Sequence, residues 1–220
     1  MDERRDRVGR VVVLLDDFHG RPPWTPRLPP VDELVYTVLS QNTADVNTGR
    51  TFAALKERYA DWAAVRDAPA AEIAATIAHG GLSQTKAPRI KAILAAISRR
   101  AGIPDLGELD AMDDAAALDY LRSLPGVGPK TAACVLLFAL GRPVMPVDTH
   151  VLRVARRLGL IDRRTTAEQA HAALTQLVGP GNVFALHVNL VRHGRRVCHA
   201  RRPECGRCPL AALCPSAGPA

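Results

Sequence analysis

Helical periodicity constrains the fold of this chain more than any other feature of its sequence. Alanine-rich segments place apolar residues three and four positions apart, which puts them on one face of an α-helix. The clearest such segments are 69–79, 86–100, 149–159 and 165–178. Alternating β-branched runs are absent, and only VVVLL at 11–15 is ambiguous between a short strand and a buried helical turn. The sequence therefore predicts an all-α protein.

Proline- and glycine-containing segments divide these helices. They lie at 21–30, 102–110, 124–129, 141–146 and 178–182, where helix-breaking residues predict turns and loops. About nine or ten helices result from this division. No fixed-period repeat occurs, which disfavours a solenoid. A length of 220 residues suits one large domain or two small ones.

The charge balance makes a nucleic acid the first partner to test. The 29 Lys and Arg residues exceed the 22 Asp and Glu residues, so the net charge is +7, and such an excess favours a polyanionic partner. A basic surface that serves solubility or an acidic protein partner is the alternative. Only four of these cations are lysines, at 56, 86, 91 and 130. We expect three of them to lie on solvated helix faces.

No segment has the pattern of a membrane span or a secretion signal. The apolar runs are far shorter than the roughly 18–20 residues that a bilayer requires, and acidic residues near the N-terminus are atypical of a signal peptide. The fractions of hydrophobic (47%) and charged (23%) residues exclude collagen-like and disordered classes. We expect a soluble cytoplasmic protein with no membrane partner.

Four cysteines are concentrated near the C-terminus, at 198, 205, 208 and 214, in a segment rich in Arg, Pro and Gly. Because disulfides are not expected in a reducing compartment, these thiols are predicted to hold a metal. Their uneven spacing favours an iron–sulfur cluster, which takes one thiolate per iron, over structural zinc, which usually pairs two Cys-x2-Cys motifs. The fifth cysteine, Cys134, is expected to be a core residue.

A glycine-containing turn at 124–129 precedes the apolar helix AACVLLFAL. Gly126 and Gly128 permit a tight turn with outward N–H groups, which can bind phosphate at the positive end of a helix. With the helix predicted before it, the turn forms a helix-hairpin-helix motif. Lys130 follows in the first helical turn, where the helix dipole favours a neutral, nucleophilic amine. Asp148, eighteen residues later, can cap the next helix.

These motifs together resemble the endonuclease III family of DNA glycosylases, in the helix-hairpin-helix superfamily. The resemblance rests on LPGVGPKTAACVLL, VDTHVLRVARRLGL and the four-cysteine tail, and it extends from about residue 31 to residue 214. It implies a two-domain glycosylase fold. A six-helix barrel domain would occupy 31–142, and a second all-α domain, formed by 1–30 and 143–220, would carry a [4Fe-4S] cluster.

The resemblance also implies an activity and the residues that perform it. The implied enzyme is bifunctional in base-excision repair: it removes oxidised pyrimidines from duplex DNA and cleaves the abasic site by β-elimination through a Schiff base. Lys130 would be the nucleophile and Asp148 its carboxylate partner. The expected partner is duplex DNA with damaged bases or abasic sites, bound by a monomer at the nucleoid. The implied cluster ligands are Cys198, Cys205, Cys208 and Cys214.

Further residues are expected to contact DNA. Leu82 matches the leucine that family members insert into the duplex. Family members also insert a polar residue, a glutamine, which here would be either Gln41 or Asn42. Asn42 aligns with that glutamine, and Gln41 lies one residue earlier. Thr37 stands where adenine-specific relatives carry a glutamate, which argues against an adenine glycosylase. The other expected contacts are Gly126, Gly128, His150, Arg201 and Arg202.

Two other functional classes stay open on the sequence. The chain could be a DNA-binding or damage-scanning module of the same fold with weak or no glycosylase activity. The motifs indicate which reactive residues are present, but they do not determine whether the pocket accepts a damaged base. It could also be a zinc-stabilised DNA-binding protein.

Overall fold

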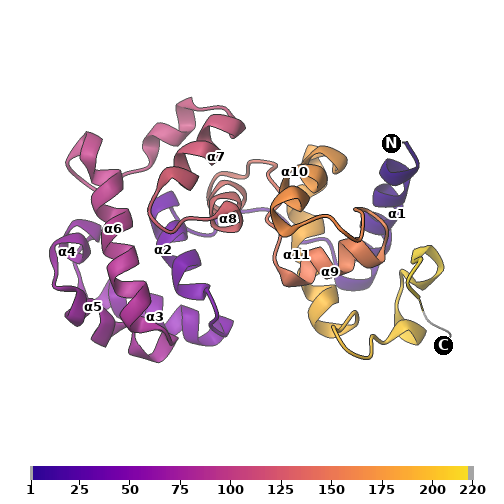
Figure 1. Cartoon of the computed structure of the whole chain (residues 1–220), viewed down its shortest axis with the longest axis horizontal. Helices are drawn as coiled ribbons and strands as arrows, with labels where there is room; N and C mark the ends of the chain where they lie inside the picture. The colour runs from indigo at the N-terminus through magenta and orange to yellow at the C-terminus, as the bar shows by residue number, and fades with distance from the viewer. Residues whose placement is uncertain (1, 218–220) are drawn as a thin grey trace. The chain divides into compact units, whose positions relative to one another are not determined.

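The computed structural model describes residues 2–217, and the chain divides into two compact units, Met1–Thr25 with Gly141–Ala220, and Pro26–Leu140 (Figure 1). All regular structure within 2–217 is helical, with eleven α-helices and five short 3-10 helices. The all-α prediction is confirmed, and the ambiguous run at 11–15 belongs to a helix. The number of α-helices exceeds the expected nine or ten because helices as short as six residues show little periodicity.

The unit Pro26–Leu140 contains seven of the α-helices. Helix α2 packs against α3 and α8, α6 packs against α4 and α5, and α7 packs against α8. Two 3-10 helices, Ala78–Gly80 and Gly107–Ala111, lie in the connections. The α-helices are α2 (Pro30–Ser40), α3 (Asp45–Arg58), α4 (Trp62–Asp67), α5 (Ala70–Thr76), α6 (Ser83–Ala101), α7 (Asp114–Ser123) and α8 (Pro129–Leu140).

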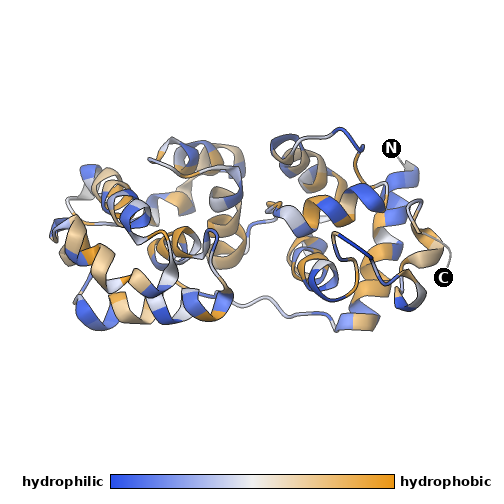
Figure 2. Cartoon of the chain, turned by 60° about the horizontal axis from the view of Figure 1, so that its bottom comes forward, coloured by the Kyte–Doolittle hydropathy of each residue, from blue (hydrophilic) through white to orange (hydrophobic). Residues whose placement is uncertain are grey.

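Helix α8 is the most deeply buried helix of this unit. Most of its residues are apolar and buried. Hydrophobic and hydrophilic residues alternate along many helices of the chain (Figure 2). Cys134 lies in its middle and is 3% exposed, as expected for a core residue. Pro129 occupies the first position of the helix. Proline suits this position because its φ is fixed near the helical value and it has no N–H that would lack a partner.

A buried ion pair joins the start of this unit to α2 and α8. The carboxylate of Glu33 is fully buried and accepts hydrogen bonds from Thr37 Oγ1 at 2.9 Å and from the guanidinium of Arg27. The Arg27 guanidinium also lies over the rings of Tyr36 and Phe138, at 4.8 and 4.3 Å from their centroids. Removal of Arg27 would leave the negative charge of Glu33 without compensation in the core.

The second unit is built from both ends of the chain. Its α-helices are α1 (Asp2–His19), α9 (Thr149–Arg157), α10 (Ala167–Leu177) and α11 (Val183–Arg196). Helix α11 packs against α1 and α9. The contact with α9 is close, since a Cβ atom at Gly194 would lie 2.8 Å from Cβ of His150. Among the described residues, no helix is long and apolar enough to cross a membrane.

Side-chain caps explain where several helices begin. Asp113 accepts the N–H of Ala116 at 2.8 Å and so starts α7. Thr166 and Gln169 form a reciprocal capping box at the start of α10. Each cap satisfies backbone donors that the first helical turn leaves without a partner.

Candidate functional site

The turn between α7 and α8 has the tight geometry of a helical hairpin. Leu124 and Val127 anchor it in the core, and the N–H of Val127 donates to the carbonyl of Leu124 at 3.1 Å. Gly126 has φ of +72°, and a Cβ atom there would lie 2.7 Å from Nε of Arg89. At Gly128, a Cβ atom would meet nothing within 4 Å. Internal packing thus requires glycine at 126 but not at 128.

Lys130 occupies the first turn of α8 and is partly exposed. Its ammonium interacts with the thiol of Cys134, one helical turn later: burial raises the pKa of this thiol, and the charge of Lys130 opposes that rise. The neighbouring Thr131 is buried, and its hydroxyl accepts a hydrogen bond from Nε2 of Gln41 at 3.4 Å. Lys130 is therefore partly exposed, and its ammonium interacts with a buried thiol of the same helix.

Asp148 caps α9, as the sequence predicted. Its Oδ1 accepts the N–H of Val151 at 2.7 Å, which leaves Oδ2 for another partner. The side chain is partly exposed. Asp148 belongs to the unit formed by the two chain ends, and Lys130 belongs to Pro26–Leu140.

Three expected DNA-contact residues share an unusual backbone conformation. Asn42, Leu82 and Arg202 have φ of 53°, 52° and 51°, and they are the three non-glycine residues with positive φ within 2–217. All three are exposed, with Leu82 at 55%. The left-handed region is unfavourable for leucine and arginine, and such strain is concentrated at functional sites.

Gln41 and Asn42 differ in their surroundings. The side-chain amide of Gln41 accepts a hydrogen bond from Nη1 of Arg89 at 2.8 Å and donates to Thr131 Oγ1. Asn42 is exposed at the tip of the loop. The side chain of Gln41 is thus held by the protein, whereas that of Asn42 projects toward solvent.

Lys86 was expected on a solvated helix face, and this prediction was wrong: the residue is 3% exposed. Its Nζ donates to the carbonyl of Leu39 at 2.7 Å, to Thr43 Oγ1 at 2.6 Å and to the carbonyl of Gly80 at 3.1 Å. Burial lowers the pKa of its ammonium. The signal was in the sequence, because Lys86 is in helical register with the buried residues Ile90, Ile93 and Ile97.

The four C-terminal cysteines line one pocket, which also has apolar walls from Val154, Leu158 and Leu210. Burial raises the pKa of the thiols of Cys208 and Cys214, and the neighbouring thiols of the set raise it further. Four thiolates would repel one another here unless a cation lay between them. The donor set therefore fits a cationic iron–sulfur core, which binds thiolates.

Two side chains contact these sulfurs. Nη1 of Arg157 lies 3.2 Å from Sγ of Cys198, and Nε2 of His193 lies 3.4 Å from Sγ of Cys208. Burial lowers the pKa of His193 to about 4, and the charge of His19 contributes. His193 is 1% exposed and is thus a packing residue.

The remaining expected DNA contacts lie in the unit that holds the cysteines. Arg201 and Arg202 are exposed in the loop between Cys198 and Cys205. His150 follows the cap of α9, is partly exposed, and has its Nδ1 3.2 Å from Nη2 of Arg153.

Comparison with known proteins identifies the family. Residues 35–180 match the sequence profile described as HhH-GPD superfamily base excision DNA repair protein. The chain belongs to this superfamily. Residues 198–214, which begin at Cys198 and end at Cys214, match the iron–sulfur binding domain of endonuclease III. The predicted resemblance is confirmed, and the iron–sulfur match confirms a [4Fe-4S] cluster over zinc as the cofactor.

Relatives place this HhH-GPD protein in the endonuclease III family. Endonuclease III of Synechocystis sp. is 35% identical over 189 residues, which cover 86% of this chain and 82% of the relative. Endonuclease III of Thermotoga maritima is 34% identical over 187 residues, which cover 84% and 82%. A putative DNA glycosylase of Arabidopsis thaliana is 35% identical over 165 residues; the match spans 75% of this chain and 56% of that longer protein.

Solved structures confirm the expected glycosylase fold for this endonuclease III-family chain. A non-covalent endonuclease III–DNA complex matches with a TM-score of 0.82 at 27% identity, over 97% of this chain and 96% of that chain. A trapped endonuclease III–DNA covalent intermediate matches with a TM-score of 0.83 at the same identity and coverage.

Proposed function

We propose that this protein is a bifunctional DNA glycosylase and abasic-site lyase of base-excision repair that acts on oxidised pyrimidines in duplex DNA. The observation that carries the proposal is a lysine, Lys130, in the first turn of the helix that follows the glycine turn, in a chain of the endonuclease III family. Water-activating side chains at this position would support base removal alone, whereas an amine can form a covalent intermediate.

The chemistry assigns separate roles to Lys130 and Asp148. As the glycosidic bond breaks, its electron pair leaves with the base and C1′ becomes positively charged, and the carboxylate of Asp148 stabilises this charge. The amine of Lys130 bonds to C1′ and loses a proton; opening of the sugar ring then gives an iminium. Loss of the C2′ proton to a base supplies the electron pair that expels the 3′ phosphate, which cleaves the strand.

The DNA contacts follow from exposure and backbone geometry. Extrusion of a base leaves a gap in the duplex, which we propose is filled by Leu82 and by Asn42, since the side chain of Gln41 already has two partners within the protein. The N–H groups around Gly126 and Gly128 are proposed to bind a phosphate. Additional phosphate contacts are assigned to His150, Arg201 and Arg202.

The proposed ligands of the cluster are Cys198, Cys205, Cys208 and Cys214, which line the pocket described above. When bound, the cluster supplies cross-links that order a segment with little apolar surface of its own. The loop that carries Arg201 and Arg202 is closed by its first two ligands. We also propose that the protein acts as a monomer, in the cytoplasm and at the nucleoid, in keeping with its bacterial relatives.

Borohydride trapping tests the proposed activity. Reduction of the Schiff base should cross-link the parent protein to duplex DNA with an abasic site, and Lys130→Ala should form no adduct. A panel of duplexes with oxidised pyrimidines then defines the lesions that are cleaved. A parent protein that binds these duplexes but forms no adduct would contradict the proposal and favour a damage-scanning module.

A further inference from the structure

Lys86 lies between the two loops whose tips carry Asn42 and Leu82. One of its acceptors, the carbonyl of Leu39, lies just before the first loop, and Thr43 directly follows Asn42. We propose that Lys86 is a positioning residue that fixes the two loops to each other, so that both tips enter the duplex as one unit. The inference rests on the proposed function of these tips.

The bonding capacity of the ammonium matches its surroundings. An ammonium has three N–H donors, and Lys86 Nζ has three acceptors at hydrogen-bonding distance, all of them neutral oxygens. Thr43 Oγ1 extends the connection, because it accepts from Lys86 and also donates to the carbonyl of Gly80 at 2.5 Å. A buried cation with neutral acceptors gains hydrogen bonds but no ion pair, so its desolvation is costly unless all three bonds form.

The second loop is fixed to Lys86 in two ways. The side chain binds the carbonyl of Gly80, two residues before Leu82, and the backbone N–H of Lys86 donates to the carbonyl of Leu82 at 2.9 Å. Gly80 itself is tightly packed, since a Cβ atom there would lie 2.8 Å from Thr51 Oγ1. The amine of Lys86 thus holds the first loop at both ends, at Leu39 and Thr43, and the second loop at its start, at Gly80.

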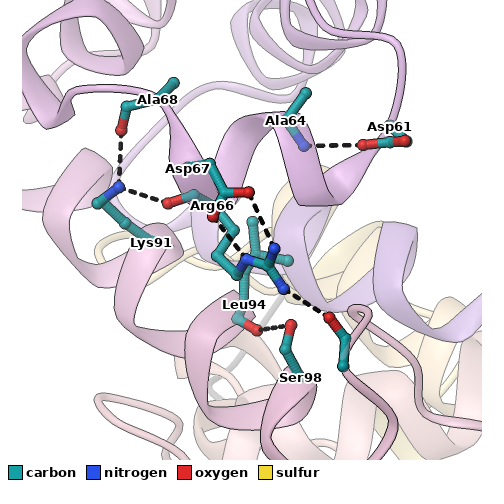
Figure 3. A network of polar contacts seen from close by, with 9 residues as sticks. Asp61, Ala64, Arg66, Asp67, Ala68, Lys91, Leu94 and Ser98 are labelled. Carbon is teal, nitrogen blue, oxygen red and sulfur yellow. Dashed lines mark hydrogen bonds and ion pairs between the residues drawn. The ribbon is translucent and has the colours of Figure 1, made fainter.

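Lys91, on the same helix, provides a matched control. Its Nζ also donates to backbone carbonyls: that of Arg66, in the last turn of α4, and that of Ala68, which follows α4, at 2.8 Å (Figure 3). Lys86→Met and Lys91→Met therefore remove the same kind of interaction from α6. Only the first of them releases the loops at 41–43 and 80–82.

The experiment compares both variants on two DNA substrates and by amide hydrogen exchange. A single strand with an abasic site has no gap to fill, so its cleavage requires Lys130 and not the tips. For Lys86→Met we expect excision from a lesion-containing duplex to fall by about 10- to 100-fold, with single-strand cleavage unchanged and faster exchange at 41–43 and 80–82. Lys91→Met should change neither cleavage nor exchange at these residues.

Several outcomes would overturn the role of Lys86. One is that Lys86→Met lowers cleavage of the duplex and of the single strand equally. Another is that Lys86→Met and Lys91→Met lower excision from the duplex equally. A third is that Lys86→Met leaves amide hydrogen exchange unchanged in both loops. If Lys86→Met does not fold, Thr43→Val removes the bridging hydroxyl and leaves Lys86 its two carbonyl acceptors. It should likewise lower excision from the duplex and leave cleavage of the single strand unchanged. A parent protein that cleaves no substrate refutes the proposed function instead, and the exchange comparison still decides whether Lys86 fixes the loops.

Discussion

Asp148 caps α9 with one carboxylate oxygen, and we propose that the same carboxylate also stabilises the positive charge on the reacting sugar. The two roles make different demands on the residue. Capping needs an acceptor of the right length, which asparagine supplies as well as aspartate. Stabilisation of a positively charged sugar needs a negative charge, which asparagine lacks.

Substitution of Asp148 should separate these roles. We expect Asp148→Asn to leave the free energy of unfolding almost unchanged and to lower the rate of base excision by about 10²- to 10³-fold. Asp148→Ala should lower the rate similarly and also reduce stability by about 1 kcal/mol, because the cap is lost. Single-turnover excision and urea unfolding measure the two effects. Full activity of the asparagine variant would show that Asp148 only caps the helix.

At the scale of elements, the turn between α7 and α8 contains two glycines with different requirements. Gly126 has a left-handed φ and lies against Arg89, whereas Gly128 borders open space. Glycine at 126 is explained by the fold, whereas no contact within the chain requires glycine at 128, where we propose that a phosphate binds.

Alanine substitutions distinguish the two requirements. Gly126→Ala should lower stability by about 1–3 kcal/mol, since it introduces backbone strain and a contact with Arg89. Gly128→Ala should leave the melting temperature unchanged but weaken DNA binding, because its methyl group would lie where a phosphate is proposed to bind. Thermal unfolding and fluorescence anisotropy with an abasic duplex measure these effects. Unaltered DNA affinity of Gly128→Ala would argue against a phosphate at this turn.

The sequence predicted the elements better than it predicted their loops. The helices at 86–100 and 149–159 and the cap at Asp148 follow from periodicity and local capping, which depend on neighbouring residues. The choice between Gln41 and Asn42 depends instead on a left-handed φ and on Arg89, which lies far away in the chain. Lys86 was missed because its residue type was given more weight than its position on the buried face of its helix.

At the scale of the whole molecule, the excess of positive charge is carried mostly by arginine, and it gives DNA binding a dependence on salt. Each phosphate contact releases counterions, so the affinity falls with salt concentration in proportion to the number of contacts. Arg201 and Arg202 are exposed in the loop between the first two cysteines and are proposed to make two such contacts.

Replacement of both arginines by alanine should therefore change the salt dependence in a defined way. We expect the slope of log affinity against log salt concentration to become shallower by about 1.8 for B-form DNA, which corresponds to two lost contacts. Arg163 and Arg164, which are exposed between α9 and α10, provide a control pair in the same unit. Equal changes of slope for the two pairs would mean that Arg201 and Arg202 have no special place in binding.

The discontinuous unit has a consequence for the order in which the protein is made. Helix α1 is translated before the segment 26–140, but it packs against α10 and α11, which are translated after that segment. The buried apolar residues of α1 are Val8, Val11, Val12 and Leu15. The segment 26–140 can complete its own core while α1 still lacks its partners, because domains fold as units during synthesis. Until α11 emerges, the hydrophobic side of α1 is a target for chaperones.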